Sequence, residues 1–114
     1  MSVSTHVLDA GRGAPAAGVA VSLSRLGPQD PDLPGGGRWD AVEAGVTDSD
    51  GRCQFAAATP AGSYRLVFAT GEYFRVRAVP AFYPEVTITF TVGRGHYHVP
   101  LLLSPFAYST YRGS

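Results

Sequence analysis

The sequence predicts an all-β fold, an antiparallel β-sandwich, and two observations support this prediction. Apolar and polar residues alternate with a period of two in segments such as GVAVSLS at residues 18–24 and EVTITFTV at residues 85–92, a pattern typical of half-buried strands. Turn sequences rich in glycine, proline and aspartate separate these segments. The chain has 114 residues, so we expect residues 1–114 to form a single domain with one core.

Seven or eight segments are expected to form strands, and one is expected to form a short helix. The stretch TGEYFRVRAVP lacks the alternation and ends at Pro80, which predicts one or two helical turns near residues 72–78. Residues 27–37, rich in glycine and proline, are expected to form a surface loop. The predicted strands are residues 3–9, 18–26, 38–47, 52–56, 63–69, 85–92, 96–103 and 107–112.

The composition argues against several classes of partner. Nine acidic residues balance nine basic ones, and no lysine is present, which excludes Schiff-base chemistry. A neutral chain with no basic run disfavours nucleic acid or an anionic membrane surface. The chain shows no signal-peptide pattern, no apolar run near the ~20 residues that cross a bilayer, and one cysteine, Cys53. These features favour a soluble protein of a reducing compartment, most simply the cytoplasm.

Three histidines are the side chains that titrate near neutral pH. His6 lies within STHVLD, and His96 and His98 lie within GHYHVPLLL. If residues 97, 99, 101 and 103 face the core, then His98 faces outward together with Pro100 and Leu102. Each histidine could instead be an ordinary hydrogen-bonded strand residue. A zinc site formed by the H-x-H pair and His6 is a further alternative, although no carboxylate or cysteine cluster completes it.

The segment TDSDGR at residues 47–52 predicts a hairpin turn at Asp50-Gly51 with Arg52 directly after it. Its acidic residues do not complete the spacing of a calcium loop. Arg52 would begin a strand, which fits an exposed strand-end arginine as well as an anion-binding group. Cys53 has no base beside it in the sequence, so we interpret it as a small buried residue rather than a nucleophile.

Several motifs taken together resemble one protein family. They are STHVLDAGRGAPAAGVAVSL, TDSDGR, GSYRLVFATGEYF with FYPEV, and the C-terminal HYHVPLLLSPFAYSTYRGS. They resemble the 5-hydroxyisourate hydrolases, the transthyretin-related enzymes of urate degradation. The final YRGS is the hallmark of these enzymes, and transthyretin itself lacks it. Residues 27–41 depart from the family pattern in being longer and richer in glycine and proline.

The resemblance implies a fold, an assembly and a reaction. The fold would be a transthyretin-like Greek-key sandwich of two four-stranded sheets with one short helix. The assembly would be a homotetramer, a dimer of dimers, and an outward face carrying Leu8, Pro100 and Leu102 is apolar enough to favour subunit contact. The reaction would be hydrolytic opening of the six-membered ring of 5-hydroxyisourate, a cyclic amidase activity that needs no cofactor and no metal. Its product would be 2-oxo-4-hydroxy-4-carboxy-5-ureidoimidazoline.

The resemblance also implies roles for individual residues. The implied catalytic residues are His6, Arg52, His98 and Ser114. A histidine with a pKa near ~6.5 can act as base and then as acid, and Arg52 suits stabilisation of a tetrahedral oxyanion. Tyr111 is expected to form the floor of the pocket, and Gly113 to allow close approach of the backbone. The implied substrate-binding residues are Leu8, Arg52, Tyr111, Arg112, Gly113 and Ser114.

Two other kinds of function compete with the enzyme. A transthyretin-like carrier would hold a ligand in its channel without reacting, and a structural or carbohydrate-binding sandwich would have no active site. The combination of His6, His98 and Arg52 with the terminal tetrapeptide favours the enzyme.

Overall fold

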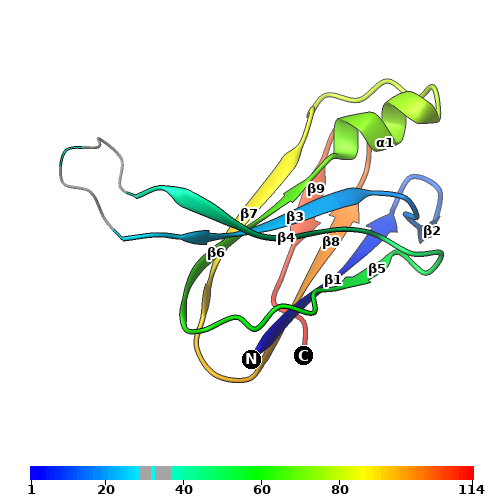
Figure 1. Ribbon diagram of the computed structural model, residues 1–114. Coiled ribbons are helices and arrows are strands. Elements are labelled where there is room, and N and C mark those ends of the chain that lie inside the picture. The colour runs from blue at the N-terminus through cyan, green and yellow to red at the C-terminus, as the bar shows by residue number, and fades with distance from the viewer. Residues whose placement is uncertain (29–31, 33–36) are drawn as a thin grey trace.

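The computed structural model describes residues 1–28, 32 and 37–114, so most of the predicted loop at 27–37 lies outside the described residues. These residues form a sandwich of two sheets with one short helix (Figure 1). The first sheet contains β1 (Ser2–Asp9), β2 (Ala14–Pro15), β5 (Arg52–Gln54), β8 (His96–Leu103) and β9 (Tyr108–Thr110). The second sheet contains β3 (Ala20–Leu26), β4 (Trp39–Val46), β6 (Gly62–Phe68) and β7 (Val86–Val92), and the helix is α1 (Thr70–Val76).

Both sheets are four strands wide, although the first contains five strands. The second sheet has the order β4-β3-β6-β7, and all its pairs are antiparallel. The first sheet has the order β2-β1-β8-β9, and β5 pairs with β1 on the edge that β2 also occupies. The expectation of two four-stranded sheets is corrected in this detail, because two short strands share one edge of β1.

β1 and β8 run parallel, which corrects the purely antiparallel arrangement expected from the sequence. Their register places Ser4 beside His98 and Val7 beside Leu101. Two parallel neighbouring strands need a long connection between them. The connection from β1 to β8 includes most of the chain. Alternation within a strand reports which face is buried but not the direction of the neighbouring strand. The parallel pairing of β1 with β8 therefore could not be predicted from the alternation pattern.

The core lies between the two sheets. In β8 the predicted inward residues Val99, Leu101 and Leu103 are confirmed, since they are at most 6% exposed. Tyr97, the fourth predicted inward residue, is half-buried and packs against the core. Pro100, predicted to face outward, is buried as well. His6 of β1 lies beside it, and the Thr110 hydroxyl donates to its carbonyl at 2.7 Å. The inward residues of both sheets pack into one cluster that includes Val3, Val7, Val21, Leu23, Tyr64, Leu66 and Phe68.

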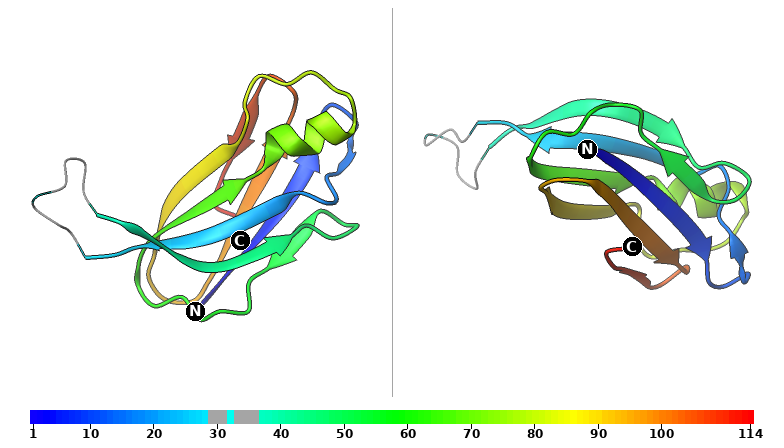
Figure 2. Two further views of the ribbon diagram at one scale, coloured as in Figure 1. Left: turned by 45° about the horizontal axis from the view of Figure 1, so that its top comes forward. Right: turned by 90° about the horizontal axis from the view of Figure 1, so that it is seen from below.

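The helix lies at one end of the sandwich, and both chain ends lie at the other (Figures 1 and 2). α1 begins at Thr70, slightly earlier than the sequence predicts, and buries Tyr73 and Phe74. The Tyr73 hydroxyl donates to the buried carboxylate of Asp9 at 2.8 Å, which ties the helix to the end of β1. No helix within the described residues is long and apolar enough to cross a membrane.

Candidate active site

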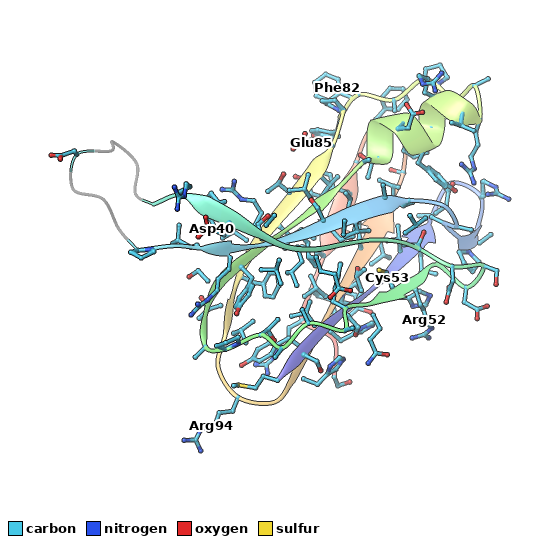
Figure 3. The ribbon with its side chains drawn as sticks, viewed as in Figure 1. Asp40, Arg52, Cys53, Phe82, Glu85 and Arg94 are labelled. Carbon is cyan, nitrogen blue, oxygen red and sulfur yellow. The ribbon has the colours of Figure 1, made fainter. Side chains whose placement is uncertain are left out.

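A pocket of about 300 Å³ opens on the outer face of the first sheet. It lies where β1, β5 and β8 meet the last residue of the chain. Arg52 and Cys53 leave β5 on opposite sides, so that Arg52 faces outward while Cys53 points toward the core (Figure 3). The structure thus brings three of the four predicted catalytic residues into one pocket. Its lining consists of Ser4, Thr5, Arg52, Cys53, Gln54, His96, His98 and Ser114.

A tight hairpin turn fixes Arg52 at this pocket. Gly51 has φ of 77°, a conformation that favours glycine, and a Cβ at this position would clash with the carbonyl oxygen of Val7. The Asp48 carboxylate accepts the backbone N–H groups of Arg52 and Asp50, each at 2.9 Å. The first of these bonds is the main reason that the pKa of Asp48 lies below its usual value. The acidic residues of this segment therefore build the turn.

His6 borders the pocket from β1. It pairs with Arg52 in the β1–β5 ladder and with Pro100 in the β1–β8 ladder. Its Nε2 lies 2.9 Å from the carbonyl oxygen of Asp50, to which it donates when that nitrogen carries the proton. This bond connects His6 to the same hairpin that carries Arg52. His6 does not itself line the 300 Å³ cavity.

The terminal segment packs directly on His98. The N–H of Gly113 donates to the carbonyl oxygen of His98 at 2.8 Å, in the antiparallel register that β9 begins. A Cβ on Gly113 would lie 2.5 Å from Cδ2 of the His98 ring, so a glycine is needed for this close approach. The contact places Ser114 in the pocket lining. On its other side, the Nδ1 of His98 lies 2.9 Å from Ser4 Oγ.

The pKa of His98 lies below its usual value. Burial disfavours the charged imidazolium, and the positive charges of Arg52, His6 and His96 lower the pKa further. A lowered pKa leaves the ring neutral at physiological pH, so one ring nitrogen keeps a lone pair that can accept a proton. His98 therefore has the protonation state that a general base requires.

The other predicted substrate-binding residues lie outside this pocket within one subunit. The Arg112 guanidinium lies over the Tyr97 ring, 4.5 Å from its centroid, and Tyr111 is 58% exposed. Both line a second pocket of about 310 Å³ between β7 and the terminal segment. Leu8 is half-buried farther along β1 and pairs with Leu102 of β8. Contact of these residues with a substrate stays a prediction.

Three residues of the pocket lining were missed by the sequence analysis, namely Ser4, Thr5 and Gln54. Ser4 is in contact with both His96 and His98, but this contact depends on the parallel register of β1 and β8. Side chains alternate along a strand, so Ser4 lies on the same face of β1 as His6, and this alternation was the one signal available in the sequence. Within the described residues, no three His, Cys, Asp or Glu side chains are grouped as metal ligands would be.

Comparison with known proteins establishes the family. A model of the HIUase/transthyretin family matches residues 3–113. The chain belongs to the HIUase/transthyretin family. The resemblance seen in the sequence motifs is thus confirmed.

Members of the HIUase/transthyretin family match the chain over nearly its whole length. The 5-hydroxyisourate hydrolase of Deinococcus radiodurans is 46% identical over 121 residues, which cover 98% of this chain and 95% of that protein. The 5-hydroxyisourate hydrolase of Mus musculus is 42% identical over 118 residues, which cover 98% of this chain and 94% of that protein.

Solved structures of the HIUase/transthyretin family confirm the transthyretin-like sandwich. The structure of Klebsiella pneumoniae 5-hydroxyisourate hydrolase has a TM-score of 0.84 and 39% identity, with 100% of both chains covered. The structure of transthyretin from Sparus aurata has a TM-score of 0.85 and 32% identity, with 97% of this chain and 95% of that chain covered.

The contact between Gly113 and His98 predicts the effect of adding one methyl group. Gly113→Ala should displace either the imidazole or the terminal segment, because its Cβ would overlap the ring. We expect changed NMR chemical shifts of the His98 ring and loss of the 2.8 Å backbone hydrogen bond in a crystal structure. The control is Gly11→Ala, whose Cβ would have its nearest neighbour at 3.4 Å. Unchanged His98 shifts in Gly113→Ala would contradict the described packing.

The electrostatic environment predicts a change in the titration of His98. Arg52→Gln removes a positive charge that lowers the pKa of His98, so this pKa should rise and the ring should become charged at a higher pH. The measurement is an NMR titration of the His98 ring protons. Arg38→Gln is the matched control, because Arg38 is exposed and pairs with Asp40. The assignment of this electrostatic effect to Arg52 is wrong if the pKa stays the same or falls.

Proposed function

We propose that the chain is a 5-hydroxyisourate hydrolase, a cyclic amidase of urate degradation. It opens the six-membered ring of 5-hydroxyisourate to give 2-oxo-4-hydroxy-4-carboxy-5-ureidoimidazoline. The observation that carries this proposal is full-length similarity to proteins named 5-hydroxyisourate hydrolase, at 46% and 42% identity in two of them. The pocket with Arg52, His98 and Ser114 supplies groups that suit amide hydrolysis. We propose that residues 1–114 act as one domain and that the reaction takes place in the cytoplasm.

The proposed mechanism begins with activation of a water molecule by His98. The neutral imidazole accepts a proton as the water oxygen adds to a ring carbonyl of the substrate. The imidazolium then gives its proton to the leaving nitrogen as the C–N bond of that amide breaks. The carboxylic acid that is formed loses its remaining proton to water and becomes a carboxylate. His98 is assigned this role because its lowered pKa favours the neutral form. His6, whose Nε2 lies 2.9 Å from the Asp50 carbonyl oxygen, supports the hairpin that carries Arg52.

Arg52 is proposed to bind the substrate and stabilise the oxyanion. Its guanidinium stays protonated and presents several donors to carbonyl oxygens. As the tetrahedral intermediate forms, negative charge develops on the former carbonyl oxygen, and a fixed cation stabilises that charge more than it stabilises the ground state. Ser114 is proposed to orient the water or His98 from the opposite wall of the pocket.

A homotetramer, built as a dimer of dimers, is proposed to complete the site. β9 is an edge strand of the first sheet and β7 is an edge strand of the second. Both edges border the same pocket, so a second copy can extend both sheets by edge pairing. Leu8 and Leu102, both half-buried, lie side by side on the outer face and favour contact between two such dimers. In this assembly, Leu8, Tyr111 and Arg112 would approach the substrate from a neighbouring subunit.

A carrier function remains the second candidate, and one observation favours it. The chain has a TM-score of 0.85 with a Sparus aurata transthyretin whose structure was solved in complex with thyroxine. Sequence identity favours the hydrolase, because it is 39% with the Klebsiella pneumoniae hydrolase and 32% with this transthyretin. An assay distinguishes the two functions: 5-hydroxyisourate is generated with urate oxidase, and its ultraviolet decay is followed with and without the protein. Decay at the spontaneous rate would favour the carrier.

Alanine substitutions test the catalytic assignments. His98→Ala should lower kcat by about 10²–10⁴-fold, the usual cost of losing a general base, and Arg52→Ala should cost a similar factor. His6→Ala should also lower turnover strongly. All three variants should keep the fold, because these side chains lie outside the core cluster. The exposed Arg38→Ala serves as control. Turnover near wild type in His98→Ala would remove it from the mechanism.

Metal removal gives a further check within the same assay. Activity should survive treatment with EDTA. Abolition of turnover by EDTA with recovery on adding zinc would replace His98 as base by a metal-bound water.

The proposed assembly predicts a particle of about four times the 12.0 kDa chain mass. Leu102→Glu should separate the tetramer into dimers, because a charge cannot be buried unpaired in an apolar contact. Light scattering measures both species. Val46→Glu is the control, because Val46 is 61% exposed on β4 of the second sheet. A fully active wild-type monomer would refute sites that are completed by neighbouring subunits.

A further inference from the structure

Side chains on the outer face of β1 and β8 form a continuous hydrogen-bonded row that ends at His98. Ser2 Oγ lies 2.6 Å from His96 Nδ1, and His96 Nε2 lies 2.8 Å from Ser4 Oγ. The same Ser4 Oγ lies 2.9 Å from His98 Nδ1. The row follows from the parallel register, which pairs Ser2 with His96 and Ser4 with His98.

The hydroxyl of Ser4 restricts how protons are arranged in this row. A serine hydroxyl has one proton and two lone pairs, and a neutral imidazole has one N–H and one lone pair. When the proton of Ser4 is used within the row, Ser4 donates to one ring and accepts from the other. When that proton points elsewhere, Ser4 accepts from both rings through its two lone pairs, and this also keeps the proton of His98 on Nδ1. Because Ser4 has one proton, it cannot donate to both rings, and the tautomers of His96 and His98 therefore depend on each other.

The row then has two arrangements with different consequences for His98. In the first, His98 Nδ1 donates to Ser4, Ser4 donates to His96 Nε2, and His96 Nδ1 donates to Ser2. His98 Nε2 then carries a lone pair. In the second, every donor is reversed and His98 Nε2 carries the proton. Of these two arrangements, only the first lets a neutral His98 accept a proton from water at Nε2.

We propose that Ser4 and His96 are positioning residues that hold the proton of His98 on Nδ1 and leave its Nε2 free as the general base. Ser4 supplies the acceptor for Nδ1. Arg52 lines the same pocket as His98, and a positive charge in the pocket favours a lone pair over an N–H on a ring nitrogen that faces the pocket. His96, exposed at the far side of Ser4, accepts the serine proton and so keeps Ser4 oriented. The need for a base rests on the proposed hydrolase function, whereas the tautomer is a property of the resting protein.

The tautomer can be measured directly by NMR of the ring nitrogens. In the wild-type protein, long-range ¹H–¹⁵N spectra should show His98 protonated at Nδ1. Ser4→Ala should move the proton to Nε2 or give a mixture, and Ser4→Thr, which keeps the hydroxyl, should restore the wild-type pattern. Ser22→Ala, which removes a hydroxyl from β3 of the second sheet, should leave the spectrum unchanged. A wild-type His98 protonated at Nε2, or an unchanged tautomer in Ser4→Ala, overturns the proposal.

Kinetics give the second measurement. Ser4→Ala should lower kcat by about tenfold, on the scale of one lost hydrogen bond, with KM little changed and with activity restored in Ser4→Thr. His96→Ala removes an exposed ring and should act in the same direction, so it serves if Ser4→Ala does not fold. Wild-type kcat in both alanine variants would also overturn the proposal. If the wild-type protein does not accelerate decay of 5-hydroxyisourate, the hydrolase function fails, and the NMR spectrum alone decides the tautomer.

Discussion

The parallel ladder between β1 and β8 is the constraint on which the site depends. Its inner face contributes Val7 and Leu101 to the core, both fully buried, and its outer face aligns Ser4 with His98. Because side chains alternate along a strand, a shift of one residue would exchange these two faces. The burial of the core residues therefore fixes the register, and the register fixes the contacts of His98. The pairing of β1 with β8 therefore determines both the packing of the core and the geometry of the site.

Much of the fold could be predicted from period-two alternation. It identified the eight longer strands and the inward residues Val99, Leu101 and Leu103, and the loss of alternation before Pro80 located the helix. The two-residue β2 was missed, because a pairing so short leaves no periodic pattern. The parallel direction of β8 was missed for a different reason. Strand direction depends on a partner far away in the sequence, which alternation does not report.

In the site, too, features encoded in short motifs could be predicted, whereas contacts between residues far apart in the sequence could not. Arg52 follows a turn whose geometry is encoded in TDSDGR, and His98 and the terminal YRGS were recognised through the family resemblance. The bond between Ser4 and His98 spans most of the chain and depends on tertiary register. Tyr111 and Arg112 lie away from the pocket within one subunit. Their proposed role depends on a neighbouring copy, and a single sequence contains no direct record of that contact.

The shared edge of β1 also limits how large the assembly can become. β5 and β2 pair with residues 4–6 and 8–9 of β1, and the backbone of Val7 between them bonds to Gly51 and Ala16. On this side the first sheet thus ends in two short strands that cap β1, and its other edge is β9. An edge-to-edge contact about a twofold axis uses that edge in both copies and leaves capped strands at both ends of the joined sheet. If the proposed assembly forms through β9, the short strands at both ends of the joined sheet offer little backbone for further pairing, so we expect growth along this sheet to stop at a pair and not to continue as an open-ended fibre.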